Sequence, residues 1–263
     1  MKQLNPYLTG GITPDWTDYL LAYQEAGADA VEIGLPFSDP MMDGATIQQA
    51  SDQALRRGVT IDSILADLVA VRAHVRIPLI AMTYANLVFR DGPETFCRRL
   101  AGAGISGLIV PDVPVDEAGR LEAAATAAGI DLILLAAPVT APDRLAEIGR
   151  RSRGFVYAVS VMDTTGERDA LAATAAPLAR RLREVTELPV LIGFGISTPG
   201  QAAAAARAGD GVVIASALMR RVLEGASPDD LRAEVAGFRA ALDQVDQEMP
   251  VARAHPEVSG YRR

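Results

Sequence analysis

The chain of 263 residues carries a formal net charge of −8, and 49% of its residues are hydrophobic while 22% are charged. The acidic balance argues against a protein that binds nucleic acid through a basic surface, and the apolar fraction argues against a disordered chain. No apolar run reaches the ~20 residues that a transmembrane helix needs, and the first residues do not resemble a signal peptide, so we expect no membrane association. A single cysteine excludes an internal disulfide, and we expect a cytoplasmic enzyme.

Apolar runs and helical periods alternate along the chain. We expect strands over residues 4–8, 28–34, 78–83, 107–110, 131–136, 155–159, 189–192 and 211–214. We expect helices over residues 14–27, 46–57, 61–74, 93–103, 116–128, 142–151, 199–208, 216–223 and 228–244, and one more within 169–187. The strands are near-continuous apolar runs, which is typical of parallel strands that are covered on both faces.

Eight strand–helix units in a chain of this length predict an α/β protein with a closed (β/α)8 TIM barrel in a single domain. The structural alternative is an open doubly wound sheet. Its dinucleotide-binding fingerprint is missing, because Gly10 and Gly11 after the first strand do not form a G-x-G-x-x-G motif. We expect the barrel to cover residues 1–245 and to be followed by a C-terminal tail over residues 246–263, which shows no clear period.

Residue types that often carry catalysis are scarce. The only lysine is Lys2, so a Schiff base or a cofactor bound as a lysine imine has no plausible internal nucleophile. The only histidines, His74 and His255, are far apart and lack Cys or His neighbours at ligand spacing, which makes a histidine-rich zinc site improbable. Cys97 follows Phe96 in a helical pattern, and this indicates a packing role. Proton transfer by carboxyl groups is the chemistry that this composition leaves open.

Two acids flank the loop that follows the second expected strand. Glu32 stands inside an apolar run, where a buried carboxylate is costly without a partner. Asp43 lies 11 residues later, just before Thr46, which is placed to begin a helix. Because the active residues of such barrels follow the strands, both carboxylates could face one pocket. A purely structural carboxylate is the alternative interpretation of Glu32.

Glycine-bearing loops follow the last three expected strands. They are Thr165-Gly166, the run GFGIS at residues 193–197, and Ala215-Ser216 at the start of a helix. Glycine lets backbone N–H groups approach an anion closely, and a helix N-terminus adds a favourable dipole. Each loop alone could be a tight turn and Ser216 a plain N-cap, but three such loops at one end of a barrel favour a phosphate site. With no lysine nearby, we expect N–H groups and the dipole to hold the anion.

Four motifs resemble the tryptophan synthase α subunit family. They are EIGLPFSDP with the following DG and TIQ in residues 32–48, MTYAN at residues 82–86, PDVP at 111–114 and GFGIS at 193–197. They stand in the family's order and spacing, and the match covers roughly residues 5–224. The resemblance implies a lyase that cleaves indole-3-glycerol phosphate to indole and glyceraldehyde 3-phosphate in L-tryptophan biosynthesis. It implies no metal or organic cofactor, and it makes a tryptophan synthase β subunit a candidate partner.

The same resemblance assigns roles to residues. Glu32 is expected to be the catalytic acid–base, and Asp43 is expected to hold the indole N–H. The other implied positions are the substrate-binding Tyr7, Tyr84, Ile109, Tyr157 and Thr165, and the phosphate-binding Gly166, Gly195, Ala215 and Ser216. The carbon–carbon cleavage needs one carboxyl that exchanges protons and one ionised carboxylate beside the ring nitrogen, so these residue types suit it.

Two positions depart from the family's usual pattern. Asp163 stands where glycine is usual, and it could weaken loop closure by like-charge repulsion or pair with an arginine. Ala215 also stands where glycine is usual, and its methyl group could narrow the approach of the anion. Two alternatives stay open: a stand-alone lyase of another pathway, and a non-catalytic homologue that regulates a β subunit. A regulator would be expected to have lost the acid pair, and here both acids are present.

Overall fold

Eight parallel strands close into a barrel in the order of the sequence, and β8 pairs with β1 to complete it. This computed structural model describes residues 1–159, 169–193 and 195–248. The strands are β1 (Gln3–Thr9), β2 (Val31–Gly34), β3 (Leu79–Met82), β4 (Ile105–Ile109), β5 (Asp131–Ala136), β6 (Val156–Val159), β7 (Val190–Gly193) and β8 (Gly211–Ile214). The predicted (β/α)8 barrel is therefore confirmed.

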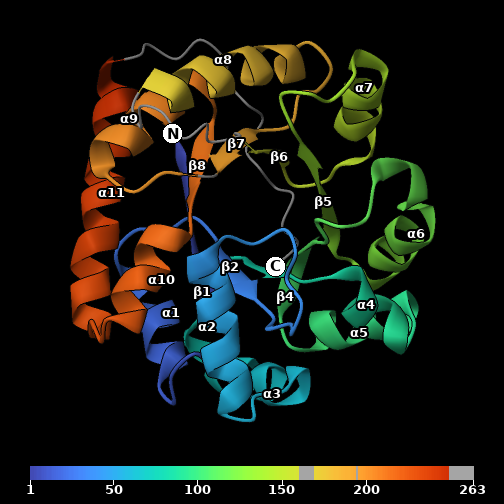
Figure 1. The fold of residues 1–263 in the computed structure, drawn as a ribbon, viewed down its shortest axis with the longest axis vertical. Coiled ribbons are helices and arrows are strands. Elements are labelled where there is room, and N and C mark those ends of the chain that lie inside the picture. Colours follow the sequence, from blue (N-terminus) through green and yellow to red (C-terminus); the bar gives the residue numbers. More distant parts are fainter. Residues whose placement is uncertain (160–168, 194, 249–263) are drawn as a thin grey trace.

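The helices form a ring around these strands (Figure 1). They are α1 (Trp16–Glu25), α2 (Ala45–Arg56), α3 (Ile61–Val71), α4 (Ala85–Arg90), α5 (Pro93–Gly102), α6 (Gly119–Ala128), α7 (Pro142–Arg151), α8 (Asp169–Arg183), α9 (Pro199–Ala208), α10 (Ser216–Leu223) and α11 (Pro228–Glu248). None of the helices in the described ranges combines the length and the apolar character needed to cross a bilayer.

Helix α4 is the one helix of the described chain that the sequence patterns did not predict. It spans six residues shortly after β3, and only Val88 in it is buried, so it shows no clear apolar period. Elsewhere the differences are at helix ends: a short 3-10 turn, Arg72–His74, finishes the helix expected over residues 61–74. The expected C-terminal tail lies outside the described residues apart from its first three, which continue α11 to Glu248.

The barrel interior is filled by side chains that alternate with those facing the helices. A buried cluster of Ala30, Ile80, Ile109, Ile133, Phe155, Tyr157, Leu191 and Val213 occupies it. Because side chains two residues apart in a strand share a face, Glu32 projects into the barrel on the same side as Ala30. In the ladder between β1 and β2, Tyr7 lies directly opposite Glu32. The acid is therefore part of the packed interior.

Two glycines make room for the tyrosines at the top of this interior. A Cβ atom at Gly34 would collide with the Tyr7 hydroxyl, and one at Gly193 would collide with the Tyr157 hydroxyl. Both glycines lie at the ends of strands, so the tyrosine rings lean across the neighbouring backbone there. The absence of these two side chains fixes where the phenol groups lie.

Replacing Gly34 by alanine is expected to lower the free energy of unfolding by about 1–3 kcal/mol, because a rigid ring and a buried strand would have to separate. The matched control is Gly200→Ala in α9, where an added Cβ meets no atom within 4 Å. That variant should be neutral or slightly more stable, since alanine favours a helix. Urea denaturation of both variants tests this, and equal stabilities would contradict the packing argument.

Candidate active site

A cavity of about 330 Å³ opens at the C-terminal ends of the strands. Its volume is typical of a small-molecule site, and its position is where barrel enzymes carry their chemistry. Its floor comes from strand residues and its walls come from the loops and helix starts above them. The lining residues are Tyr7, Glu32, Asp43, Gly44, Ala45, Thr46, Ile47, Met82, Tyr157, Gly195, Ile196, Ser197, Val213, Ala215, Ser216 and Arg220.

Most of the residues that the resemblance implied meet in this cavity. Those that line it are Tyr7, Glu32, Asp43, Tyr157, Gly195, Ala215 and Ser216. Tyr84 and Ile109 lie just behind the lining: Tyr84 contacts Asp43, and Ile109 belongs to the interior cluster that contains Tyr157. Thr165 and Gly166, together with the departure at Asp163, lie outside the described residues.

Glu32 is the most confined ionisable group of the site. Its side chain is 1% exposed, and neither carboxyl oxygen has a hydrogen-bond partner among the described residues. Burial alone raises the pKa of Glu32 to about 8, since water and protein dipoles that would stabilise the charge are missing. At neutral pH the group therefore holds its proton, and it can act as an acid towards a ligand in the cavity.

Asp43 experiences a different environment. Burial raises its pKa, and a hydrogen bond from the Tyr84 hydroxyl opposes that rise. The same hydroxyl accepts a hydrogen bond from the Met42 N–H at 3.2 Å, and the Tyr84 ring stacks on Phe37 at 5.3 Å between centroids. Tyr84 thus anchors the acidic loop and stabilises the charged form of Asp43. Two carboxyls in contrasting surroundings are suited to separate acid and charge-stabilising roles.

The two tyrosines at the floor remain neutral. Burial raises the pKa of Tyr7 above its ordinary value, and the nearby charge of Asp43 adds to the effect. Burial and then the proximity of Glu32 raise the pKa of Tyr157 in the same way. Their hydroxyl groups can therefore donate hydrogen bonds to a ligand but cannot serve as bases near neutral pH.

Three helix starts border the cavity, those of α2, α9 and α10, and only α9 has a side-chain cap. The Thr198 side chain accepts from the Gln201 N–H, while Gln201 Oε1 accepts from the N–H groups of Ser197 and Thr198 at 2.7 and 3.1 Å. Ala215 stands at the N-cap of α10, and no side chain bonds to that helix start. Because the first N–H groups of a helix lack intrahelical partners, α10 presents free donors towards the cavity.

Backbone conformation explains why glycine stands at position 195 and shows that alanine at position 215 causes no strain. Gly195 has φ of +74°, a value that residues with side chains rarely adopt. Ala215 has φ of −117°, so alanine is accommodated there without backbone strain. The departure at Ala215 therefore adds a methyl group to the lining without distorting the start of α10.

Several side chains that line the cavity had no role assigned from the sequence, among them Met82, Val213 and Arg220. The first two are barrel-interior positions that only strand register reveals. Arg220 lies four residues after Ser216 in the same helix, and that spacing puts the two residues on one face. This spacing was the available signal for a cationic residue near the expected phosphate loop.

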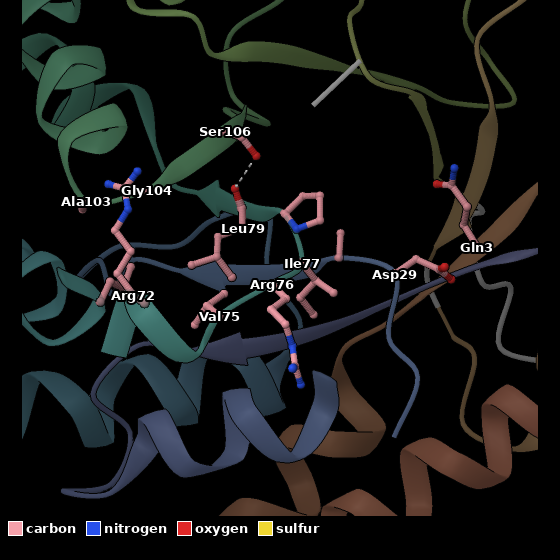
Figure 2. A pocket seen from close by; sticks show the side chains of 13 residues that line it. Gln3, Asp29, Arg72, Val75, Arg76, Ile77, Leu79, Ala103, Gly104 and Ser106 are labelled. Carbon is pink, nitrogen blue, oxygen red and sulfur yellow. Dashed lines mark hydrogen bonds between the residues drawn. The ribbon is translucent and has the colours of Figure 1, made fainter. Parts of the chain in front are cut away.

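A larger cavity of about 570 Å³ lies at the opposite end of the barrel. Figure 2 shows Gln3 and Asp29 on one side of it and Arg72 with Gly104 on the other, around the first residues of β1 to β4. It contains none of the implied site residues, and no paired acids converge in it. Volume alone therefore does not identify the reacting centre. Within the described ranges, no three His, Cys, Asp or Glu side chains gather as metal ligands would.

The raised pKa of Glu32 predicts how stability depends on pH. The folded state binds this proton more tightly than the unfolded chain, whose glutamates titrate near 4.5. The free energy of unfolding should therefore fall as pH rises from about 4.5 to about 8, by up to ~1.4 kcal/mol per pH unit from this group. Glu32→Gln should remove that slope and become the more stable protein towards pH 8.

Chemical denaturation at pH 5, 6.5 and 8 measures this slope. The matched control is Glu94→Gln on the barrel exterior, where a hydrogen bond from Arg120 lowers the pKa of Glu94. The titration of Glu94 lies below this window, so the control should keep the wild-type slope. Parallel curves for wild type and Glu32→Gln would show that Glu32 is ionised in the folded protein at neutral pH.

Comparison with known proteins places this geometry in a family. Residues 2–249 match the family described as tryptophan synthase alpha chain. The alpha chain of Gloeobacter violaceus is 44% identical over 94% of this chain and 90% of its own length. A tryptophan synthase structure from Mycobacterium tuberculosis is 40% identical, with a TM-score of 0.84 and 92% of each chain covered. The A-subunit of Pyrococcus furiosus is 35% identical, with a TM-score of 0.82, over 91% of this chain and all of that one. The chain therefore belongs to the tryptophan synthase alpha chain family.

Proposed function

We propose that this chain cleaves indole-3-glycerol phosphate to indole and glyceraldehyde 3-phosphate, as the α subunit of tryptophan synthase in the cytoplasm. The observation that carries the proposal is the protonated, unpartnered Glu32 in one cavity with Asp43. Family membership supports the same reaction. The cavity also supplies a helix start for the phosphate group, at the wall formed by Ala215 and Ser216.

Glu32 serves as the acid and then as the base. Its carboxyl donates a proton to C3 of the indole ring, which places positive charge on the ring nitrogen. The resulting carboxylate removes the proton from the hydroxyl on the chain carbon attached to C3. A C=O bond forms there, the bond between that carbon and C3 breaks, and its electron pair returns to the ring. Indole and the aldehyde leave, and Glu32 holds a proton again.

Asp43 acts on the other side of the ring. Its carboxylate accepts a hydrogen bond from the indole N–H and stabilises the charge that develops on the nitrogen. The hydrogen bond from Tyr84 keeps Asp43 in place and favours its ionised form. The apolar side chains of Ile47, Met82 and Val213 in the lining suit the flat faces of the indole ring. Tyr84 thus acts on the reaction through Asp43.

The remaining implied positions keep the roles that the resemblance gives them. Tyr7 and Tyr157 contribute neutral hydroxyls at the floor of the cavity, and Ile109 supports Tyr157 from below. Gly195 and Ser216 belong to the phosphate end. For Thr165 and Gly166, which lie outside the described residues, the resemblance implies substrate binding and phosphate binding, respectively. No metal or organic cofactor is needed, since each proton passes through Glu32.

Replacing Glu32 by glutamine should abolish indole formation, with a loss of at least ~10²–10⁴ in kcat, because the amide can neither give nor take the proton. Asp43→Asn should also lower kcat, since a neutral amide stabilises the ring cation less. The control Glu94→Gln changes an acid on the outer surface and should keep wild-type turnover. Indole release from indole-3-glycerol phosphate measures all three, and wild-type release by Glu32→Gln would refute the mechanism.

Adding a tryptophan synthase β subunit separates the proposal from its alternatives. The two-subunit enzyme predicts a large gain in the rate of indole formation when both subunits are mixed. Fast turnover by the isolated chain, unchanged on mixing, would instead indicate a stand-alone lyase. A non-catalytic regulator would release no indole in either case, and the intact pair of Glu32 and Asp43 argues against it.

A further inference from the structure

Arg220 is the one basic residue among the described residues that line the cavity, and the acidic ones are Glu32 and Asp43. It is an exposed residue of α10, and it lines the same cavity as Glu32, Asp43 and Ser216. Among the described residues, no carboxylate or carbonyl oxygen is bonded to its guanidinium group. The neighbouring Arg221 is different, because it pairs with Glu224 and Glu234 at 3.3 Å each. Of these two adjacent arginines, only Arg220 is left available for a ligand.

The helix geometry directs this charge towards the start of α10. Ser216 and Arg220 are four residues apart, so they lie on one face of the helix, about one turn from each other. Side chains in helices point back towards the N-terminus, and the long arginine side chain can therefore reach the first turn. No side chain caps the N–H groups of that turn, and its first residues, Ala215 and Ser216, line the cavity.

We propose that Arg220 binds the phosphate group of the substrate, together with the N–H groups at the start of α10. The planar guanidinium can give two parallel hydrogen bonds to phosphate oxygens, which a backbone N–H cannot do. Its charge also offsets the repulsion that a phosphate would meet in a cavity containing Asp43. The assignment rests on the proposed function only for the identity of the ligand, because the binding of a phosphate to Arg220 can be measured without turnover.

The two products probe the two ends of the cavity separately. Glyceraldehyde 3-phosphate carries the phosphate and indole carries the ring, so calorimetric titration of each reports one end. In Arg220→Met, the Kd for glyceraldehyde 3-phosphate should rise about 10-fold, which corresponds to the loss of one charge-assisted contact at a partly exposed site. The Kd for indole should stay unchanged. The effect should shrink at high salt, because salt screens an exposed charge pair.

Two further variants make the test specific. Arg220→Lys keeps the charge without the planar fork and should recover part of the lost affinity for glyceraldehyde 3-phosphate. Arg221→Met removes the adjacent surface arginine and should bind both products as the wild type does. Wild-type affinity of Arg220→Met for glyceraldehyde 3-phosphate would overturn the proposal, and so would an equal loss of affinity for indole. Failure of the wild-type chain to release indole would contradict the lyase function while leaving this binding result to be read separately.

Discussion

The site depends on one carboxyl group that the protein buries and leaves without a hydrogen-bond partner. Glu32 belongs to the barrel interior by strand register, and a charge in that position would lack both water and dipoles to stabilise it. The interior therefore keeps the group protonated at neutral pH. The carboxyl group lines the cavity above it, so a ligand bound there can receive the proton. Asp43 stands on a loop, where a tyrosine supports its charge. One fold thus holds two carboxyls in contrasting surroundings.

Small residues position the rest of the site. Gly34 and Gly193 allow two tyrosine rings to cross neighbouring strands, and this sets the floor of the cavity beside Glu32. At the other end of the cavity, the N–H groups at the start of α9 are capped by side chains, and those at the start of α10 are not. Gln201 occupies the N–H groups that precede α9, whereas Ala215 offers nothing to the start of α10. The uncapped donors at the start of α10 therefore lie on the wall that also carries Arg220.

The sequence predicted the eight strands because parallel strands buried on both faces consist of short, continuous apolar runs. Glycine or proline ends most of these runs. The sequence could not predict α4, which has six residues, only one of them buried, and is separated from β3 by Thr83 and Tyr84 alone. Glu32 was found because a carboxylate is unusual inside an apolar run, and Asp43 because it lies in the loop that follows the same strand. The positions of Arg220 and Met82 in the cavity were not predicted. Arginine is common on the surface of a helix, and methionine is common in a buried strand, so neither residue stands out in the sequence. Their proximity to the acids follows from barrel closure, which joins segments that are distant along the chain.

The uncapped start of α10 has a consequence for the whole protein. A phosphate bound there would satisfy the donors that a side chain satisfies at α9, so the ligand would serve as a removable helix cap. Helix α10 packs on α2 and β1, and the start of α2 carries the loop with Asp43. Occupancy of the phosphate end would then strengthen the element against which the acidic loop rests. Binding of the phosphate would therefore stabilise α10 locally. This stabilisation would be lost each time the product leaves and restored each time a new substrate binds.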